Sequence, residues 1–188
     1  MEGVQKRVLG VVGSPRRGGN TETLVDEVLR AAAESGAVTE KVILKGLRIG
    51  PCQACDGCKG SGVCVQKDDM AALLVKMVAS DVWVLGTPIY WWGPTAQFKL
   101  FMDRWYAQEN GPAKGAFKGK RAILTVPMGD SDASTARHTV GMVQDALNWL
   151  EADLVDIVLA PGVNDPGEVK QHPDVMGAAF RAGTKAAA

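Results

Sequence analysis

The chain has 188 residues, of which 46% are apolar, and its 21 basic and 21 acidic side chains cancel. This length and apolar content suit a single domain, residues 1–188, with a sizeable core. The balanced charge gives no reason to expect nucleic acid or a membrane surface as a partner, and no apolar run is long enough to span a bilayer. The first residues also hold too short an apolar run for a signal peptide, so we expect a reducing, cytoplasmic compartment.

Buried-strand patterns and amphipathic-helix patterns alternate along the chain. In chain order we expect a strand at 7–14, a helix at 20–36, a strand at 39–45, a helix at 68–79, a strand at 81–88, a helix at 94–107, a strand at 120–129, a helix at 131–152, a strand at 154–160 and a helix at 173–183. This alternation predicts an α/β fold with a parallel sheet covered by helices on both faces. Five strands in one domain of this size fit the flavodoxin-like, doubly wound order 2-1-3-4-5. The alanine-rich end, TKAAA, is expected to be a frayed tail.

Ligands of doubly wound sheets bind beyond the carboxyl ends of the strands, so the loops there are the first place to look for a site. The loop after the first strand, GSPRRGGNTET at 13–23, is called the phosphate loop below. Its glycines let a ligand approach the backbone, and the helix that follows favours an anion at its start. Its polar side chains are those of Ser14, Arg16, Asn20 and Thr21. Because the loop has neither Gly-Lys-Ser/Thr nor G-x-G-x-x-G, it indicates a monophosphate site, and the alternative is a solvated glycine turn.

A second loop, GTPIYWWGPTAQFK at 86–99, follows the third strand and is called the aromatic loop below. Tyr90 and Trp91 offer flat faces on which a planar ring can stack, and the backbone of 88–93 can hydrogen-bond the polar edge of such a ring. Trp92 is equally consistent with a core or subunit contact, since consecutive side chains cannot all face one ligand. The aromatic loop therefore predicts a site for a planar ring.

The loop after the fourth strand, VPMGDS at 126–131, offers a further wall. Gly129 would let backbone N–H groups approach the ring. A phosphate site and a ring site on neighbouring loops suggest one ligand that has a phosphate at one end and a planar ring at the other. Flavin mononucleotide, FMN, has this form.

These segments resemble those of a known family. GSPRRGGNT, GTPIYWWGPTAQFKLFMDR and PCQACDGCKGSGVCVQKDDM are similar to the NADPH-dependent FMN reductase family, above all to its iron-sulfur flavoprotein branch. The resemblance covers most of the chain and weakens after about residue 130, although GVNDPGEVKQHPDVM still looks like the C-terminal segment of the family. It implies that the FMN phosphate is held by Ser14, Arg16, Asn20 and Thr21. It implies that the isoalloxazine is lined by Pro88, Ile89, Tyr90, Trp91 and Gly93.

The resemblance also implies a homodimer or homotetramer with FMN near a subunit interface. Phe98, Phe101 and Trp105 share one face of a predicted helix, which is expected to be core or a contact with a second subunit. Together with the aromatic loop, that face offers more apolar surface than one small sheet needs, which supports a homo-oligomer. Asp103 and Arg104 are expected to form a structural ion pair.

All the cysteines of the chain lie within thirteen consecutive residues of one segment, 51–67, called the cysteine loop below. They are Cys52, Cys55, Cys58 and Cys64, in the pattern C-x2-C-x2-C-x5-C. Closely spaced cysteines can wrap a 4Fe-4S cluster, and the glycines among them permit the tight turns this needs. A zinc site is an alternative, although zinc sites usually pair two separated C-x2-C units. Free thiols or a disulfide are the third interpretation.

The sequence therefore predicts an FMN-dependent oxidoreductase that also carries a 4Fe-4S cluster. Electrons would pass between NAD(P)H or a reduced carrier and an acceptor, and the redox partner would be a small molecule or a ferredoxin-like protein. Because the flavin carries the chemistry, no side chain is predicted to be catalytic. Two alternatives stay open, a cluster-free NAD(P)H:FMN or quinone reductase and a non-enzymatic flavin electron carrier.

Overall fold

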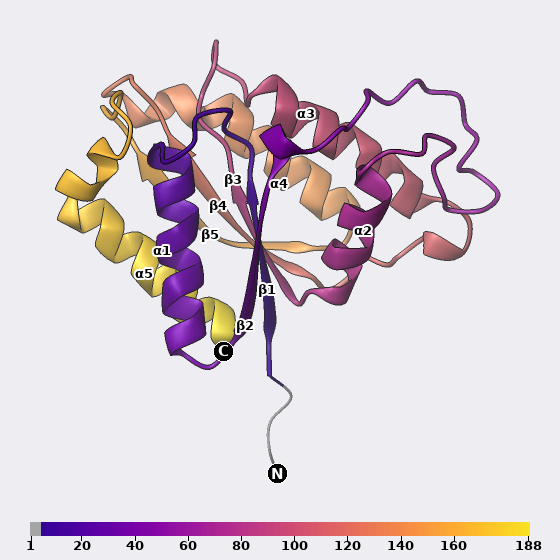
Figure 1. Ribbon diagram of the computed structural model, residues 1–188, viewed down its shortest axis with the longest axis horizontal. Coiled ribbons are helices and arrows are strands. Elements are labelled where there is room, and N and C mark those ends of the chain that lie inside the picture. Colours follow the sequence, from indigo (N-terminus) through magenta and orange to yellow (C-terminus); the bar gives the residue numbers. More distant parts are fainter. Residues whose placement is uncertain (1–4) are drawn as a thin grey trace.

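The computed structural model describes residues 5–188 and contains one five-stranded parallel sheet (Figure 1). The strands are β1 (Arg7–Val12), β2 (Val38–Ile43), β3 (Val82–Gly86), β4 (Arg121–Pro127) and β5 (Asp153–Ala160). Their order across the sheet is β2-β1-β3-β4-β5, and every neighbouring pair is parallel. The predicted α/β fold and strand order are confirmed.

The position of each strand in the sheet follows from its residue pattern. In β1 every residue after Arg7 is buried, and in β3 every residue is buried, as a near-continuous apolar run requires when helices cover both faces. The edge strands β2 and β5 mix polar and apolar residues and are only partly buried. Along β3, Trp83 and Leu85 enter one apolar core while Val82 and Val84 enter the other.

Two layers of helices form those cores with the sheet. The helices are α1 (Asn20–Glu34), α2 (Met70–Ala79), α3 (Ala96–Asp103), α4 (Arg137–Trp149) and α5 (Pro173–Ala187). Figure 1 shows α1 and α5 side by side on one face, and α2, α3 and α4 on the other. No helix within residues 5–188 has both the length and the apolar character that crossing a membrane would need.

The C-terminal helix runs further than the sequence indicated, and the frayed tail was a wrong expectation. Helix α5 continues to Ala187, because Ala182 and Ala186 are fully buried in the core that α5 shares with α1. Gly183 allows this close packing, since a Cβ on it would lie 2.1 Å from the carbonyl oxygen of Val28 on α1. Small residues therefore order the segment by tertiary contact.

The expected helix at 94–107 is divided. Helix α3 ends at Asp103, and the chain continues as a 3₁₀ helix over Arg104–Glu109. The expected helix at 131–152 likewise starts with a 3₁₀ turn at Ala133–Ala136, where the carboxylate of Asp132 accepts a bond from Ser134 N at 2.8 Å. Such local side-chain bonds compete with the regular α-helical pattern.

The apolar face of α3 is core. Phe98 and Phe101 are fully buried, and Trp105 is 3% exposed, with the rings of Phe101 and Trp105 edge to face at 5.2 Å. The expected subunit contact through this face is therefore wrong, because these side chains are already covered within one chain. The exposed aromatic residues lie elsewhere, at Tyr90, Trp91, Trp92, Tyr106 and Trp149.

Candidate functional site

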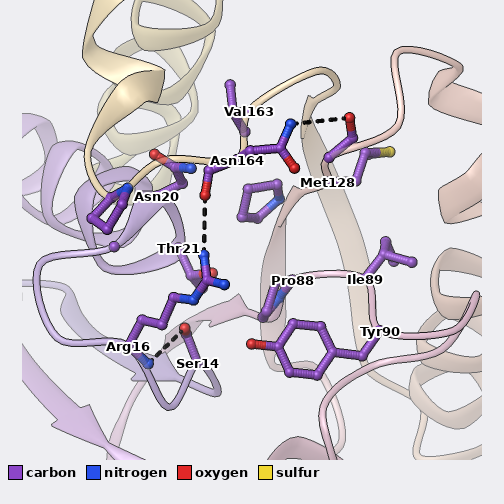
Figure 2. Close-up of a pocket in the computed structure, with 14 residues that line it drawn as sticks. Ser14, Arg16, Asn20, Thr21, Pro88, Ile89, Tyr90, Met128, Val163 and Asn164 are labelled. Atoms are coloured by element: carbon purple, nitrogen blue, oxygen red, sulfur yellow. Dashed lines mark hydrogen bonds between the residues drawn. The ribbon is translucent and has the colours of Figure 1, made fainter.

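Loops that follow four different strands meet around one cavity at the carboxyl edge of the sheet (Figure 2). They come from the ends of β1, β3, β4 and β5, where a ligand site was expected. Eight of the predicted FMN residues line this cavity: Ser14, Arg16, Asn20, Thr21, Pro88, Ile89, Tyr90 and Gly129. The structure thus brings together residues that are more than a hundred positions apart in the chain.

The phosphate loop forms the polar end of the cavity. Helix α1 begins at Asn20 behind Gly19, and within residues 5–188 no side chain caps its N-terminus. Its first N–H groups therefore remain available to an anion. Ser14 is buried and its Oγ accepts a bond from the N–H of Arg16 at 3.2 Å, while the Arg16 side chain is exposed. A guanidinium fork and a helix N-terminus facing the same space suit a phosphate.

The side chain of Asn20 supports a loop that the sequence had not assigned to the site. Its Nδ2 donates to the carbonyl oxygen of Asp165 at 3.0 Å, and its Oδ1 accepts from the N–H of Val169 at 3.1 Å. These bonds join the start of α1 to the segment after β5. Asn20 borders the cavity, but its amide oxygen and one amide hydrogen are engaged by the protein itself.

That segment, 161–168, is the wall that the sequence analysis missed. Val163, Asn164 and Pro166 line the cavity, and the carbonyl oxygen of Asn164 accepts a bond from Arg16 Nη1 at 3.0 Å. Figure 2 shows Asn164 between Arg16 and the loop after β4. A Cβ on Gly129 would lie 2.2 Å from Asn164 Oδ1, so close approach of Asn164 is one reason for glycine there. The likeness of GVNDPGEVKQHPDVM to the family's C-terminal segment was the available signal, but it gave no position in space.

The carboxylate of Glu168 holds this wall. It accepts hydrogen bonds from the N–H groups of Asp165 at 2.9 Å and Asn164 at 2.6 Å, and these bonds lower the pKa of Glu168 below its ordinary value of 4.5. Because the folded-state pKa is depressed, the stabilisation is fully present above the ordinary pKa. It is lost as the pH falls through the lowered value.

Glu168→Gln is expected to weaken FMN binding about two- to tenfold at neutral pH, because a neutral amide accepts these bonds less strongly and the wall then loosens. The variant should also lose the part of the acid sensitivity of FMN binding that Glu168 causes. Flavin fluorescence titrations between about pH 3 and pH 7 measure both effects. Glu109→Gln is the control, since Glu109 lies outside this cavity, at the end of the 3₁₀ helix after α3. Unchanged affinity in Glu168→Gln would show that the wall does not contribute to binding.

The aromatic loop contains a tight two-residue turn. The N–H of Tyr90 donates to Gly93 O at 2.8 Å and the N–H of Gly93 to Tyr90 O at 3.1 Å. Trp91 and Trp92 form the tip with φ of +50° and +59°, a left-handed conformation that costs a non-glycine residue about 1–2 kcal/mol. The Tyr90 ring extends into the cavity in Figure 2.

The two tryptophans lie outside this cavity. Trp91 is 90% exposed and Trp92 is 51% exposed, and both border an adjoining hollow that also touches Ile89, Met128 and Gly129. Gly93 lines neither space and instead closes the turn with Tyr90. Of the predicted ring contacts, Pro88, Ile89 and Tyr90 are therefore in the cavity, Trp91 is beside it, and Gly93 supports it.

Thr95 fixes the phosphate loop against the aromatic loop. Its buried hydroxyl donates to Gly13 O at 2.6 Å and accepts from Phe98 N at 3.2 Å, which caps α3. The N–H of Gly13 donates to Gly86 O at 2.7 Å, and a Cβ on Gly13 would lie 2.9 Å from that oxygen. The sequence analysis missed Thr95, although threonine after proline at a helix start is a capping signal.

The cysteine loop follows β2 at the same edge of the sheet. All four cysteines are free, with Cys58 buried, Cys64 half-buried, and Cys52 and Cys55 exposed. Ala54 and Asp56, which lie between the first three cysteines, have left-handed φ of +50° and +56°. Among residues 5–188 no three His, Cys, Asp or Glu side chains are arranged as a metal site.

The base of the cysteine loop shows a further difference from expectation. Arg104 does not pair with Asp103, which instead forms an ion pair with Lys99 at 2.5 Å. The partner of Arg104 is Asp68, at 2.6 Å, at the far end of the cysteine loop. The direction of a buried side chain is set by the packing around it, which adjacency in sequence does not reveal.

Comparison with known proteins identifies the family. The chain matches the NADPH-dependent FMN reductase family over residues 6–164. The chain belongs to the NADPH-dependent FMN reductase family. It is 45% identical over 161 residues to an iron-sulfur flavoprotein of Methanocaldococcus jannaschii, a match that covers 85% of this chain and 78% of the relative. An iron-sulfur flavoprotein of Archaeoglobus fulgidus is 37% identical over 118 residues, covering 62% of this chain and 54% of that protein.

A solved structure gives the same fold. The NAD(P)H:quinone oxidoreductase of Methanothermobacter marburgensis superposes with a TM-score of 0.77 at 17% identity, covering 97% of each chain. As a member of the FMN reductase family, this protein is an FMN-dependent oxidoreductase, as the sequence indicated.

Arg16 is the only residue with a full formal charge among the described residues that line the cavity of this FMN reductase. The electrostatic part of anion binding therefore depends on Arg16 and the start of α1.

Proposed function

We propose that this protein passes electrons between NAD(P)H or a reduced carrier and an acceptor through FMN and a 4Fe-4S cluster. The observation that carries the proposal is the presence of four free cysteines on one loop of a chain that is 45% identical to an iron-sulfur flavoprotein. The cluster ligands would be Cys52, Cys55, Cys58 and Cys64. No other cysteine is present in the sequence to complete such a set.

The residues that line the cavity suit the two ends of FMN. Its phosphate would lie at the start of α1, within reach of Arg16 and the hydroxyls of Ser14 and Thr21. Its ring would lie against Ile89 and Tyr90, beside the glycine backbone after β4. When bound, FMN would accept two electrons from a nicotinamide and release them one at a time. The chain itself holds the phosphate, orients the ring and leaves the exposed side of the aromatic loop open to a partner.

The cysteine loop fits a cluster by the chemistry of its donors. Four thiols on one short segment match the ligand number of a 4Fe-4S cluster, which would supply a one-electron site. Left-handed residues at Ala54 and Asp56 give the segment the turns that wrapping needs, and such turns form concave backbone surfaces around many iron-sulfur sites. Binding would require the exposed arms of the loop to close on the metal, as happens where ligation and folding are coupled.

A cluster-free NAD(P)H:FMN or quinone reductase is the second candidate. It is favoured by the finding that, within residues 5–188, no three of the thiols are arranged to hold a metal. The FMN cavity involves none of the cysteines and would serve both candidates equally.

We also propose that the protein is cytoplasmic and forms a homo-oligomer. Its redox partner would be a small molecule or a ferredoxin-like protein. The exposed tryptophans beside the cavity support an oligomer whose flavin lies near the interface.

The test is the cofactor content and size of protein purified without oxygen. We expect one FMN and about four irons with about four sulfides per chain, an absorption shoulder near about 400 nm beside the flavin bands, and a dimer or larger particle by light scattering. FMN without iron, even after anaerobic reconstitution with iron and sulfide, would favour the cluster-free reductase. One zinc per chain would favour a structural site. A monomer at micromolar concentration with FMN bound would contradict the oligomer.

A further inference from the structure

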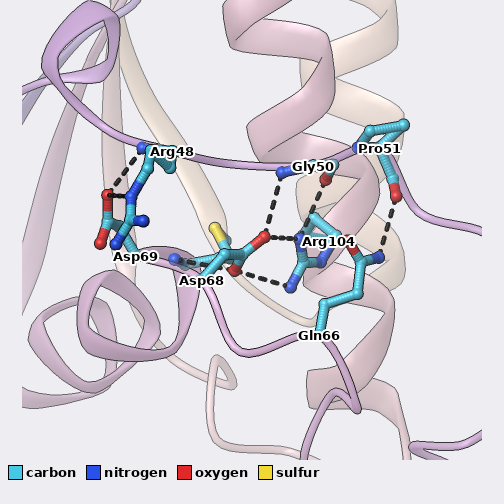
Figure 3. Close-up of polar contacts among 8 residues, drawn as sticks. Arg48, Gly50, Pro51, Gln66, Asp68, Asp69 and Arg104 are labelled. Carbon is cyan, nitrogen blue, oxygen red and sulfur yellow. Dashed lines mark hydrogen bonds and ion pairs between the residues drawn. The ribbon is translucent and has the colours of Figure 1, made fainter.

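The guanidinium of Arg104 is buried at the base of the cysteine loop, which is an unusual place for a charge. Arg104 is 2% exposed and lies just after α3. It donates to the two carboxylate oxygens of Asp68 at 2.6 and 3.0 Å and to the carbonyl oxygen of Gly50 at 2.9 Å. Figure 3 shows Arg104 between Gly50 and Asp68, the residues that flank the cysteine loop on its two sides.

These contacts close the base of the loop. The carboxylate of Asp68 also accepts from the N–H of Gly50 at 3.0 Å, and Gln66 Nε2 donates to Pro51 O at 2.9 Å. The two arms are therefore joined just before Cys52 and just after Cys64. All four thiols lie on the segment that this closure defines, which reduces the entropy that ordering the segment would otherwise cost.

Stability alone does not account for a charge in this position. A buried ion pair is often no more stabilising than apolar side chains of the same volume, because both charges lose their hydration. Gln66 and Pro51 would still join the arms without a charge between them. The arginine therefore calls for a role that an apolar residue could not fill.

One hydrogen-bond donor of the Arg104 guanidinium has no acceptor among the described residues. Its Nε–H is buried and, within residues 5–188, has no hydrogen-bond partner. Cys64 and Arg104 line the same cavity beside α2, so the Cys64 thiol is a candidate partner for this donor. A guanidinium keeps its positive charge in a protein even where it is buried. A buried charged donor without a partner is costly, which implies that a partner is present in the working protein.

We propose that Arg104 is a positioning residue for the metal-ligating thiolate of Cys64, to which its free Nε–H donates. This inference rests on the proposed cluster. Asp68 holds the guanidinium in place, and the guanidinium then balances the negative charge of the sulfur. Hydrogen bonds and positive charge at a ligand sulfur make an iron-sulfur site easier to reduce and help to retain the metal.

The experiment compares anaerobically prepared wild type, Arg104→Gln and Arg104→Lys. We expect Arg104→Gln to lose iron to a chelator about tenfold faster than wild type and to have a lower reduction potential at the iron centre. Arg104→Lys keeps the charge but not the fork, so its potential should lie between the two. FMN content and the flavin potential should stay at wild-type values in both. Lys99→Gln is the matched control, since it removes an exposed ion pair on the neighbouring helix.

The potential separates a positioning role from a purely structural one. Arg104→Gln that binds FMN normally and keeps the wild-type iron potential would overturn the inference, even if its thermal unfolding temperature fell. If Arg104→Gln does not fold, the potential of Arg104→Lys decides, and a wild-type value there would overturn the inference as well. Wild type that binds FMN but no iron would overturn the cluster and this inference together. If the wild type holds iron and Arg104→Gln has the same iron retention and the same iron potential, the inference about Arg104 is overturned and the proposed cluster is not.

Discussion

Replacing Arg16 by alanine is expected to weaken FMN binding about ten- to a hundredfold. A hydrogen bond between a guanidinium and a phosphate contributes about 1.5–3 kcal/mol, and Arg16 is the only residue with a full formal charge among the described residues that line the cavity. The change also removes the bond from Arg16 to Asn164 O, which loosens the wall after β5. Equilibrium titration of flavin fluorescence with apoprotein measures the dissociation constant directly.

Two comparisons make this result specific to the phosphate. Arg17→Ala removes a charge of the same sign from the neighbouring position, which is exposed and outside the cavity, and should change affinity little. Riboflavin lacks the phosphate, so it should bind the wild type poorly, and Arg16→Ala should weaken its binding much less than that of FMN. Equal affinity of the wild type for FMN and riboflavin would show that the phosphate is not held by this loop.

Cys58→Ser is expected to lose most of the iron of the protein while keeping its FMN. Cys58 is the one buried thiol of the four, and burial is the main cause that raises the pKa of this thiol. A serine hydroxyl is a poor ligand for iron in such a site. The FMN cavity depends on loops after other strands and should remain intact. We expect a nicotinamide still to reduce the variant, which should then pass electrons poorly to a one-electron acceptor.

The measurement is iron, zinc and FMN per chain in anaerobic wild type and variant. About four irons in the wild type and well under half of that in Cys58→Ser would support the cluster. Ser61→Ala is the control within the same loop, because it removes a hydroxyl that bonds only to the backbone of Val63. A Cys58→Ser protein with wild-type iron content would remove Cys58 from the ligand set.

The wall after β5 shows where prediction from sequence stopped. Parallel strands place all their carboxyl ends at one edge, so the loops after β1, β3 and β4 could be assigned to one site from their glycines, aromatics and arginine. The position of Asn164 depends on how the fifth strand ends and on the hydrogen bonds that Asn20 and Glu168 form with the segment after it. Neither the end of the strand nor these bonds leave a residue pattern that marks a ligand site.

The prediction for the tip of the aromatic loop was incomplete for a different reason. Consecutive aromatic residues predicted a ring site, but a two-residue turn rotates the side chains of Tyr90 and Trp91 away from each other. Tyr90 enters the cavity and Trp91 points to solvent beside it. Turn geometry of this kind usually requires Asn-Gly, so two tryptophans gave no signal for it.

The sequence by itself determined the order of strands and helices, the edge of the sheet where the site lies and the family, because these depend on hydrophobic periodicity and on short motifs that act locally. Only the tertiary structure decided which side chains share a cavity, that the aromatic face of α3 is buried within one chain, and that Arg104 pairs with Asp68. The physical reason is that burial, close packing and ion pairing are set by segments far apart in the chain. Arg104 and Asp68 are 36 positions apart, and Arg16 and Asn164 are 148 apart, so their contacts exist only once the sheet has assembled.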